Sequence, residues 1–408
     1  MKKYVKFVLF VSIILGVSYI SIINTKIQAD AKTIKEINVC MYGVVGDGIT
    51  DNTKAIDDVL KKYAGKEIYF PAGVYLVSGK LNIYSDTIIR GDGINSKIIA
   101  IQGKEAGTEI FQIKSQQNIQ IKEICVSGNS IVNNGEQYSD IDGIHLFDMW
   151  DVKDIEIKGC YFIDNIYAAV RIFGGSDIEI LDTSFLNVDC GVLTLGDYDV
   201  SNLTVNECLF KGHNWSEAIS LYGRGSYENI YLYNNVIEDK ISGHGILIND
   251  QSNNKNINIR NNIISNCAVA ISTFEVDGGT ITNNIVNRTT SGRGIEVYGC
   301  KDVVVQDNII ADTNFDSLSI KNCEQSEFIG NNIIITSNAK NKDMAGIKVL
   351  EVCNNVVIAN NTIQRVGESL NKYSISVKGI GKIEIYENDL YDIPVYISSE
   401  SQGTSYME

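Results

Sequence analysis

Acid–base chemistry in this sequence depends on few side chains, because only three histidines occur among 408 residues. One candidate catalytic set is Asp189, Glu217 and His244. Two carboxylates that flank a glycosidic bond, with an imidazole beside them to adjust their protonation, form the arrangement that hydrolysis of that bond requires. We therefore treat these three residues as a possible hydrolytic site.

A second candidate set combines a carboxylate, an imidazole and a guanidinium in Asp142, His145 and Arg171. A guanidinium binds a carboxylate through parallel hydrogen bonds, and an imidazole accepts or delivers a proton near neutral pH. This trio can hold the carboxylate of a uronate sugar and move a proton beside it. The residue types alone do not choose between the two sets.

Both sets must be brought together by the elements that carry them, and those elements repeat. From about residue 143 onward, a small residue and alternating apolar residues precede a polar turn and a second alternating segment, as in residues 218–222, 245–249 and 294–298. Alternation predicts short strands, and a repeat of roughly 20 to 30 residues predicts stacked coils around an aliphatic interior.

An asparagine recurs at one position of the repeat and marks one corner of the coil: Asn235, Asn262, Asn284, Asn308, Asn332, Asn361 and Asn388. In the earlier coils the same position is occupied by Cys160, Thr183 and Cys208. Asn tolerates left-handed backbone conformations, and its amide can bond to the copies above and below. Glycosylation triplets at Asn202, Asn214 and Asn287 are the other interpretation of these asparagines. We predict an all-β fold, a single-stranded right-handed parallel β-helix with an N-terminal capping helix over residues 53–63, started by Asp51 or Asn52.

Alternation along the first strand of each coil also predicts which side chains face outward. One outward column includes His145 and Arg171. The next carries aromatics that can stack on the C–H faces of sugar rings, and these residues together with Arg293 are the predicted substrate-binding set: Phe147, Phe173, Tyr222, Phe274 and Tyr298. A long loop that covers the aromatics is the alternative.

The first thirty-one residues are typical of an export signal. Three lysines precede an apolar stretch over residues 7–23, and Ala29-Asp30-Ala31 offers a cleavage site. The alternative is an uncleaved N-terminal anchor; in both cases the rest of the chain lies outside the cytosol. We divide the chain into residues 1–31 as signal, 36–398 as β-helix and 399–408 as a polar tail. The net charge of -15 opposes nucleic acid and anionic membrane surfaces as partners.

The block from residue 39 to 93 reads Tyr42-Gly43-Val44-Val45-Gly46-Asp47-Gly48, then Ile68-Tyr69-Phe70-Pro71-Ala72-Gly73, then Arg90-Gly91-Asp92-Gly93. It resembles the opening of the pectate-lyase-like superfamily of β-helices, especially its rhamnogalacturonase- and epimerase-like members. The resemblance implies a polysaccharide substrate and a hydrolase, lyase or epimerase reaction. The resemblance does not determine the oligomeric state, and a trimer is one of the possibilities.

Three short motifs are similar in part to those of polygalacturonases: Asn187-Val188-Asp189, Ser216-Glu217 and Gly243-His244-Gly245. Ser216 stands where that family has the first acid of a pair, and no Arg-x-Lys follows one coil later, so the hydrolase pattern is incomplete. Lyases of this fold use calcium, which the resemblance therefore implies as an option. Two acidic turns could supply calcium ligands, and they contain Asp148, Asp151, Asp154, Asp197 and Asp199. The simpler interpretation is that these are solvated turn residues.

Nine cysteines show no metal-binding spacing, and we expect most of them to be buried thiols, with Cys300 and Cys323 able to pair under oxidising conditions. The resulting functional hypothesis is a secreted carbohydrate-active enzyme that cleaves or epimerises a polysaccharide, an acidic one being the first choice. The alternative is a β-helix that binds a glycan or a host surface without catalysis.

Overall fold

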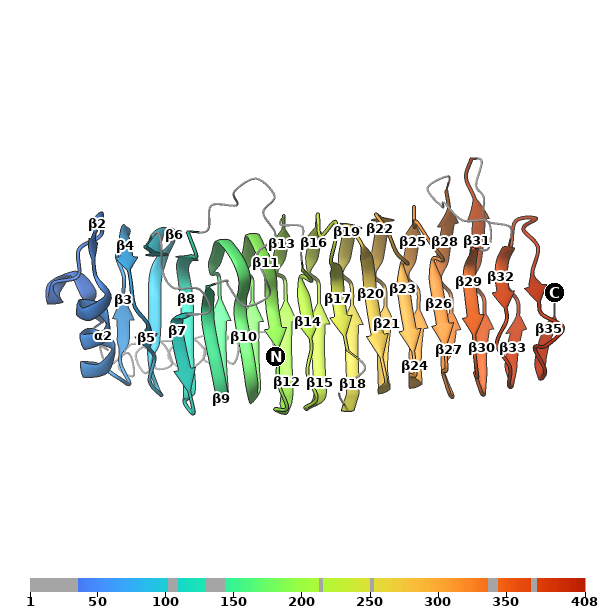
Figure 1. Cartoon of the computed structure of the whole chain (residues 1–408), viewed down its shortest axis with the longest axis horizontal. Helices are drawn as coiled ribbons and strands as arrows, with labels where there is room; N and C mark the ends of the chain where they lie inside the picture. The colour runs from blue at the N-terminus through green and yellow to red at the C-terminus, as the bar shows by residue number, and fades with distance from the viewer. Residues whose placement is uncertain are drawn as a thin grey trace, which may run out of the picture.

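The chain forms a right-handed parallel β-helix of about 13 turns, which confirms the predicted fold class (Figure 1). The computed structural model describes residues 36–101, 109–129, 144–212, 216–249, 253–336, 344–367 and 373–407. The expected signal at residues 1–31 lies outside these residues. No helix in the described ranges is long and apolar enough to span a membrane.

Strands of successive coils pair in parallel and form three long sheets. The first sheet contains β5 (Leu81–Asn82), β7 (Glu109–Lys114), the first half of β9 (His145–Lys158), the middle of β10 (Tyr161–Leu181), the end of β11 (Ser184–Thr194), β14 (Ile219–Leu221), β17 (His244–Ile248), β20 (Val269–Phe274), β23 (Ile295–Tyr298), β26 (Leu318–Lys321), β29 (Ala345–Leu350), β32 (Tyr373–Val377) and β34 (Tyr396–Ile397). All of the predicted site residues in the described ranges lie on this sheet or beside it.

The other two sheets complete each coil. The second contains β1 (Ile37–Asn38), β3 (Glu67–Tyr69), β6 (Ile88–Ala100), β8 (Gln117–Ser127), the ends of β9 and β10, β12 (Val200–Asn206), β15 (Ser226–Tyr233), β18 (Asn253–Arg260), β21 (Val276–Thr282), β24 (Lys301–Gln306), β27 (Glu327–Ile329), β30 (Val356–Ala359), β33 (Ile383–Tyr386) and β35 (Thr404–Met407). The third contains β2 (Asp47–Asp51), β4 (Gly73–Val77), the ends of β6 and β8, the starts of β10 and β11, β13 (Leu209–Lys211), β16 (Val236–Glu238), β19 (Ile263–Cys267), β22 (Ile285–Thr289), β25 (Ile309–Ala311), β28 (Asn332–Ile335) and β31 (Thr362–Arg365).

The core is a set of aliphatic columns that run the length of the solenoid. In the first sheet Ile246, Ile271, Ile295 and Leu318 lie in register on successive coils, and none of them is exposed. Burying one such side chain stabilises the fold by about 1.5–3 kcal/mol. Because the inward positions are mostly occupied by such side chains, we look for reactive groups among the outward side chains and at the corners.

A buried asparagine ladder forms one corner, as predicted, with one correction. Each ladder amide donates from Nδ2 to the Oδ1 of the next ladder residue, for example Asn284 to Asn308 at 3.0 Å. Asn308 bonds in turn to Asn331 rather than to the predicted Asn332, because Asn332 pairs with Ile309 in the strand that follows the corner. The left-handed residue is the one before each ladder position, such as Asn261 with φ 56°.

The N-terminal end is closed by helix α2 (Thr53–Lys62), which follows the 3-10 turn η1 (Val39–Tyr42) (Figure 1). Ile56, Val59 and Leu60 are buried against the first coil. Asn52 is the N-cap residue but makes no side-chain capping hydrogen bond, and Oδ1 of the preceding Asp51 accepts the backbone N–H of Thr53 at 3.0 Å. The helix therefore covers apolar side chains that would otherwise meet water at the end of the stack.

Two further expectations concern the cysteines and the C-terminal segment. Eight of the nine cysteines are buried, Cys40 is exposed, and none forms a disulfide in the structure. At the other end, Thr404–Met407 pairs with β33 as strand β35, so part of the segment expected as a tail extends the second sheet.

Candidate functional site

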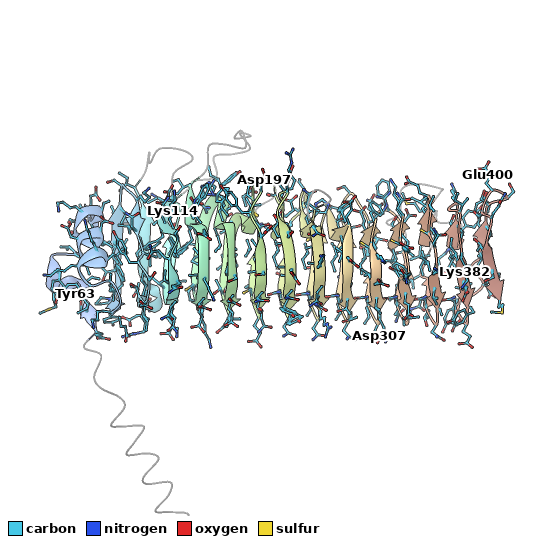
Figure 2. The ribbon with its side chains drawn as sticks, turned by 90° about the horizontal axis from the view of Figure 1, so that it is seen from below. Tyr63, Lys114, Asp197, Asp307, Lys382 and Glu400 are labelled. Atoms are coloured by element: carbon cyan, nitrogen blue, oxygen red, sulfur yellow. The ribbon has the colours of Figure 1, made fainter. Side chains whose placement is uncertain are left out.

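The candidate site is the outward face of the first sheet, and the strand register defines its columns. One column contains Arg171, Leu193, Ser220, Leu247, Ser272, Glu296, Ser319 and Lys348. The adjacent column carries Lys114, Trp150 and Phe173 on three successive coils. Figure 2 shows the labelled Lys114 and Asp197 on one long side of the solenoid and Asp307 on the opposite side.

The predicted outward positions of His145 and Phe147 are wrong. The register pairs Arg171 with Asp148 and Phe173 with Trp150, three residues later than the sequence alignment assumed. Because three is an odd number, the shift exchanges the two faces of the strand. Phe147 is fully buried and stacks on Phe111 with ring centroids 4.8 Å apart.

His145 is also removed from the surface. Its ring packs edge-to-face on Tyr167 at 4.6 Å, and the residue is 2% exposed. Burial, with a smaller contribution from the nearby charge of Arg171, lowers the pKa of His145 to about 3. His145 is therefore a neutral interior side chain and does not face a substrate together with Arg171. Asp142, the third member of that set, lies outside the described residues.

The true outward positions assemble an aromatic patch, which we define as Trp150, Phe173 and Tyr198. Trp150 and Phe173 stack with centroids 3.9 Å apart, and the exposed ring of Tyr198 meets both edge-on. Trp150 and Tyr198 were missed by the sequence reasoning. Only the correct pairing of β9 with β10 could have identified Trp150 as a neighbour of Phe173.

A buried ion pair supports the aromatic patch. Asp148 receives the guanidinium Nε of Arg171 at 2.7 Å on one oxygen and the indole N–H of Trp150 at 2.7 Å on the other. The carboxylate is 3% exposed. The guanidinium also lies 4.9 Å from the ring centre of Phe173. Arg171 is thus occupied by Asp148, and its main effect is to hold the rings of the patch in place.

Glu217 and His244 form the second feature of this face. The register that pairs Ile219 with Ile246 places them on adjacent coils in one column. His244 Nδ1 lies 3.5 Å from Glu217 Oε1, and Ser216 donates to Glu217 Oε2 at 2.8 Å. Burial raises the pKa of Glu217, but the contacts with His244 and Ser216 outweigh it and leave the pKa below its usual value. Glu217 is an ionised carboxylate that is still about a quarter exposed.

Asp189, the third residue of the predicted hydrolytic set, lies one residue before this column. The register that pairs Val192 with Ile219 aligns Cys190, rather than Asp189, with Glu217. Asp189 is half-buried, and its backbone carbonyl accepts a hydrogen bond from Lys240 at 2.6 Å. The structure therefore brings Glu217 and His244 into contact and leaves Asp189 beside them.

A charged network occupies the same face several coils further on. Arg293 Nη1 lies 2.6 Å from Glu296 Oε1, and its Nε lies 3.5 Å from Asp316. Ser272 donates to the other oxygen of Glu296 at 2.6 Å. Because Glu296 and Asp316 are nearly fully buried, Arg293 is committed to them. Arg293 was predicted to bind substrate, but its guanidinium already contacts the carboxylates of Glu296 and Asp316.

The remaining predicted aromatics stay on this face. Phe274 and Tyr298 lie in register and meet edge-to-face at 5.3 Å, and the Tyr298 hydroxyl is 3.2 Å from Ser319 Oγ. Tyr222 is 45% exposed. Together with the aromatic patch, these rings form an interrupted row along the first sheet.

The acidic turns do not fit a calcium site. Asp148 is paired with Arg171, and Asp199 accepts the backbone N–H of Ser226 at 2.7 Å. Asp151 and Asp154 are left-handed corner residues. Among the described residues no group of three or more His, Cys, Asp or Glu side chains is arranged to hold a metal ion.

A groove of about 430 Å³ lies on the second sheet and contains none of the predicted catalytic or substrate-binding residues; of the acidic turn residues considered for calcium, only Asp154 lines it. Its lining includes the side chains of Asp154, Glu156, Asp177, Glu179 and Tyr231. Lys122 forms an ion pair with Glu156 at 3.0 Å. The groove is acidic, and it is separate from the face that carries Glu217 and the aromatic patch.

The chemistry available on the first sheet follows from these contacts. Trp150 and Tyr198 of the aromatic patch offer flat apolar surfaces with polar edges, which suit the C–H faces of sugars. Phe173 is only 9% exposed and lies against the ring of Trp150, so it supports the patch rather than contacting a substrate. Glu217 offers a carboxylate that can accept a proton or stabilise positive charge, and His244 places an imidazole beside it that can take part in proton transfer. This combination suits acid–base chemistry on an extended, polyhydroxylated substrate.

Known families and proteins are similar to this chain over much of its length. The model of a family described as "Rhamnogalacturonase A/epimerase, pectate lyase-like" matches residues 36–296. Plasmin and fibronectin-binding protein A of Streptococcus pneumoniae is 24% identical over 452 residues, covering 94% of this chain and 60% of that protein. The pre-neck appendage protein of Bacillus phage B103 is 25% identical over 253 residues, covering 57% of this chain and 26% of that protein. The chain thus spans less than two thirds of the length of these relatives.

Solved structures of low sequence identity share the fold. The Streptococcus pneumoniae surface protein and adhesin PfbA has a TM-score of 0.60 at 17% identity, covering 89% of this chain and 100% of that chain. The mannuronan C-5 epimerase AlgE4 A-module of Azotobacter vinelandii has a TM-score of 0.56 at 15% identity, covering 91% and 100%. The family 28 exopolygalacturonase of Yersinia enterocolitica has a TM-score of 0.54 at 14% identity, covering 91% and 78%. At these identities the likeness shows the architecture alone.

Proposed function

The chain belongs to the rhamnogalacturonase A/epimerase family of pectate-lyase-like proteins, and from that premise we propose that it is an extracellular polysaccharide-active enzyme. In this proposal an extended glycan lies along the first sheet and reacts at Glu217 and His244. The relatives are surface and phage appendage proteins, which is in keeping with a site of action outside the cell.

The observation that carries the proposal is the position of the aromatic patch relative to the Glu217–His244 pair. Both lie on the first sheet: Glu217 is two coils beyond Phe173 along the solenoid, about 10 Å at the usual strand spacing, and its column lies five residues earlier along the strands, about 16 Å across the sheet. A sugar chain that stacks on Trp150 and Tyr198, which lie against the buried ring of Phe173, reaches the carboxylate if it runs diagonally across the sheet. Binding and reactive groups at this separation suit a chain of linked sugars better than a single small molecule.

In the proposed reaction Glu217 acts as the ionised carboxylate and His244 as the proton carrier. The lowered pKa of Glu217 favours a role as base or as a stabiliser of positive charge at the sugar ring, rather than as the acid. The acid of a hydrolytic pair would then be His244 or the half-buried Asp189. Elimination and epimerisation need only the base and a proton donor, so the pair is compatible with all three reactions.

The charge of the substrate stays open within this proposal. An acidic chain needs cationic side chains that offset the net charge of -15, but Arg171 and Arg293 are already paired with carboxylates. We therefore propose a polysaccharide without restricting it to acidic ones. The test has to include neutral and acidic chains.

The experiment is incubation with a panel of neutral and acidic polysaccharides, followed by three assays. New reducing ends without ultraviolet absorbance indicate hydrolysis, and absorbance from a new carbon–carbon double bond indicates elimination. Exchange of solvent deuterium into intact chains indicates epimerisation. We expect Glu217→Gln to reduce the rate at least 100-fold, in the range found when a positioned acid–base group is lost.

The matched control is Glu228→Gln, which removes an exposed carboxylate from the same coil on the second sheet. We expect this variant to keep the full rate. Equal rates for the Glu217→Gln variant and the unaltered protein would contradict the assignment of Glu217 as the reactive carboxylate.

A second candidate is adhesion without catalysis, which the similarity to plasmin and fibronectin-binding protein A over 94% of this chain favours. Under this alternative the panel yields no products, while immobilised glycan, fibronectin or plasmin retains the protein. Binding of a glycan that Trp150→Ala abolishes, with no product from any substrate, would replace the enzymatic proposal with this one.

A further inference from the structure

The contact between Glu217 and His244 depends on a close approach of two coils at Gly243. A Cβ atom at this position would collide with the backbone carbonyl of Ser216 and would lie 3.0 Å from the backbone nitrogen of Glu217. These are backbone atoms, which cannot turn away as the end of a flexible side chain can. Glycine is therefore the residue that lets the coil of His244 lie this close to the peptide bond before Glu217.

The coil geometry by itself does not require a glycine at this position. Gly243 is not among the glycines with a positive φ, so an alanine could adopt its backbone conformation. The register that pairs His244 with Val269 makes Ala268 the equivalent residue on the next coil, and Ala268 carries a Cβ atom. The need for glycine is local to the coil that carries Glu217, where the backbone N–H of Ala218 also donates to the His244 carbonyl at 3.0 Å.

Ser216 holds the carboxylate of Glu217 from the other side. Its hydroxyl donates to Glu217 Oε2 at 2.8 Å, while Glu217 Oε1 lies 3.5 Å from His244 Nδ1. The two carboxylate oxygens thus have different partners. The hydroxyl limits the rotation that would turn Oε1 away from the imidazole.

Other titratable groups also surround Glu217. Cys190 on β11 and Lys240, at the corner between β16 and β17, interact with it electrostatically, and Asp189 lies beside its column. All three residues are kept in the variants described below. A difference between those variants therefore reports on the contacts that Ser216 and His244 make with the carboxylate.

We propose that Ser216 and Gly243 are positioning residues of the Glu217–His244 pair. The serine hydroxyl fixes the rotation of the carboxylate, and the absence of a side chain at Gly243 lets the imidazole approach it. This inference rests on the proposed function only in taking that pair as the reactive centre. Residues that merely support the fold would change its stability without changing how Glu217 titrates.

The test is an NMR titration of protein labelled with ¹³C at the glutamate carboxyl groups, with the Glu217 signal assigned by its loss in Glu217→Gln. In Ser216→Ala we expect the pKa of Glu217 to rise by about half a unit to one unit, because the ionised carboxylate loses a hydrogen bond. Ser216→Thr keeps a hydroxyl and should restore the value. The control is Ser201→Ala on the second sheet, where Ser201 pairs with Glu228, and no change in Glu217 is expected.

Gly243 is tested through His244. We expect Gly243→Ala to raise the pKa of Glu217 by a similar amount, because the added methyl group separates the coils and weakens the contact with the imidazole. In protein that already carries His244→Gln, the same alanine should add less than half of that rise. A glycine that acts independently of His244 would have equal effects in both backgrounds.

An unchanged titration of Glu217 in folded Ser216→Ala or Gly243→Ala overturns the proposal, and so do equal effects of Gly243→Ala with and without His244. If Ser216→Ala does not fold, Ser216→Cys, which keeps the size of the side chain, is titrated in its place. Loss of folding in Gly243→Ala shows that the glycine supports the stack rather than the pair and overturns its assignment. The titration requires no glycan, so its result is separate from a failure to find a polysaccharide substrate.

Discussion

At the scale of single residues, the buried amide ladder shows how a polar side chain can serve as core. Asn262 is fully buried, donates from Nδ2 to Leu232 and Asn284, and accepts two hydrogen bonds from Asn235 on its Oδ1. Replacement by Ala leaves the buried donors of Asn235 without a partner. We expect Asn262→Ala to lower the free energy of unfolding by about 3 kcal/mol, measured by urea titration.

The neighbouring Asn261 provides the control. Its amide donates to Asn234 at 3.2 Å on the exposed side of the same corner, and its φ is 56°. Asn261→Gly keeps that left-handed backbone available and removes an exposed hydrogen bond only. A change within about 0.5 kcal/mol is expected, and equal destabilisation by the two variants would argue against the ladder as a source of stability.

His145 gives the fold a defined sensitivity to acid. Its pKa is about 3 in the folded chain because of burial and the charge of Arg171, and about 6.5 when the chain is unfolded. Between these values the unfolded state binds a proton that the folded state does not, so stability falls as the pH falls. The contribution is about 3 kcal/mol between pH 7 and about pH 4.5.

Replacement of the imidazole isolates this effect. We expect His145→Gln to lose less stability than the unaltered protein when urea unfolding is repeated at the lower pH. The acidic residues contribute equally in both proteins and cancel in the comparison. Parallel pH dependences would show that His145 already carries its proton when folded.

The same residue shows where sequence reasoning reaches its limit. Alternation located the strand around Phe147 but could not determine its register, because Leu146, Phe147 and Met149 are all buried and obscure the alternation there. Asp148, which looks like a turn residue, is instead an outward strand position paired with Arg171. The Glu217–His244 neighbourhood was predictable because regular coils lead from Ile219 to Ile246.

At the scale of elements, helix α2 covers the apolar end of the first coil, just as each of the other coils is covered by its neighbour. Leu60 is 1% exposed and packs into the hydrophobic core. We expect Leu60→Ala to lower the free energy of unfolding by about 2–5 kcal/mol, through lost burial and the cavity that remains. The measurement is urea unfolding followed by circular dichroism.

Lys61, the exposed residue next in the same helix, gives the matched variant. Lys61→Ala improves helix propensity slightly and removes no packing, so its unfolding curve should overlay that of the unaltered protein. If both variants unfolded at the same urea concentration as the unaltered protein, α2 would be dispensable to the stack.

Elements also differ in how readily the sequence predicts them. The amphipathic pattern and the polar start of α2 predicted its bounds to within one residue, because a helix on the end of a stack has one buried face. The irregular pairing between Asn165 and Ala168, where β10 shifts register against β11, has no such signature. It arises from how one corner packs on the next, which is a property of two coils together.

At the scale of the whole molecule, residues one repeat apart in the sequence lie one coil apart along the first sheet. From Trp150 the register leads through Phe173, Tyr222 and Phe274 to Tyr298, six coil steps in all. Six steps correspond to about 29 Å. A glycan that uses the whole row has to be long, and one that uses only the aromatic patch can be short.

Chain length is therefore the variable that tests the whole face. We expect affinity for oligosaccharides of the bound glycan, measured by isothermal titration calorimetry, to keep rising beyond the tetrasaccharide. Trp150→Ala should weaken short and long chains alike, because stacking on the patch is common to both. Tyr298→Ala should weaken long chains only. Equal affinities for disaccharide and longer chains, or a Tyr298→Ala effect on the disaccharide, would restrict recognition to a single local site.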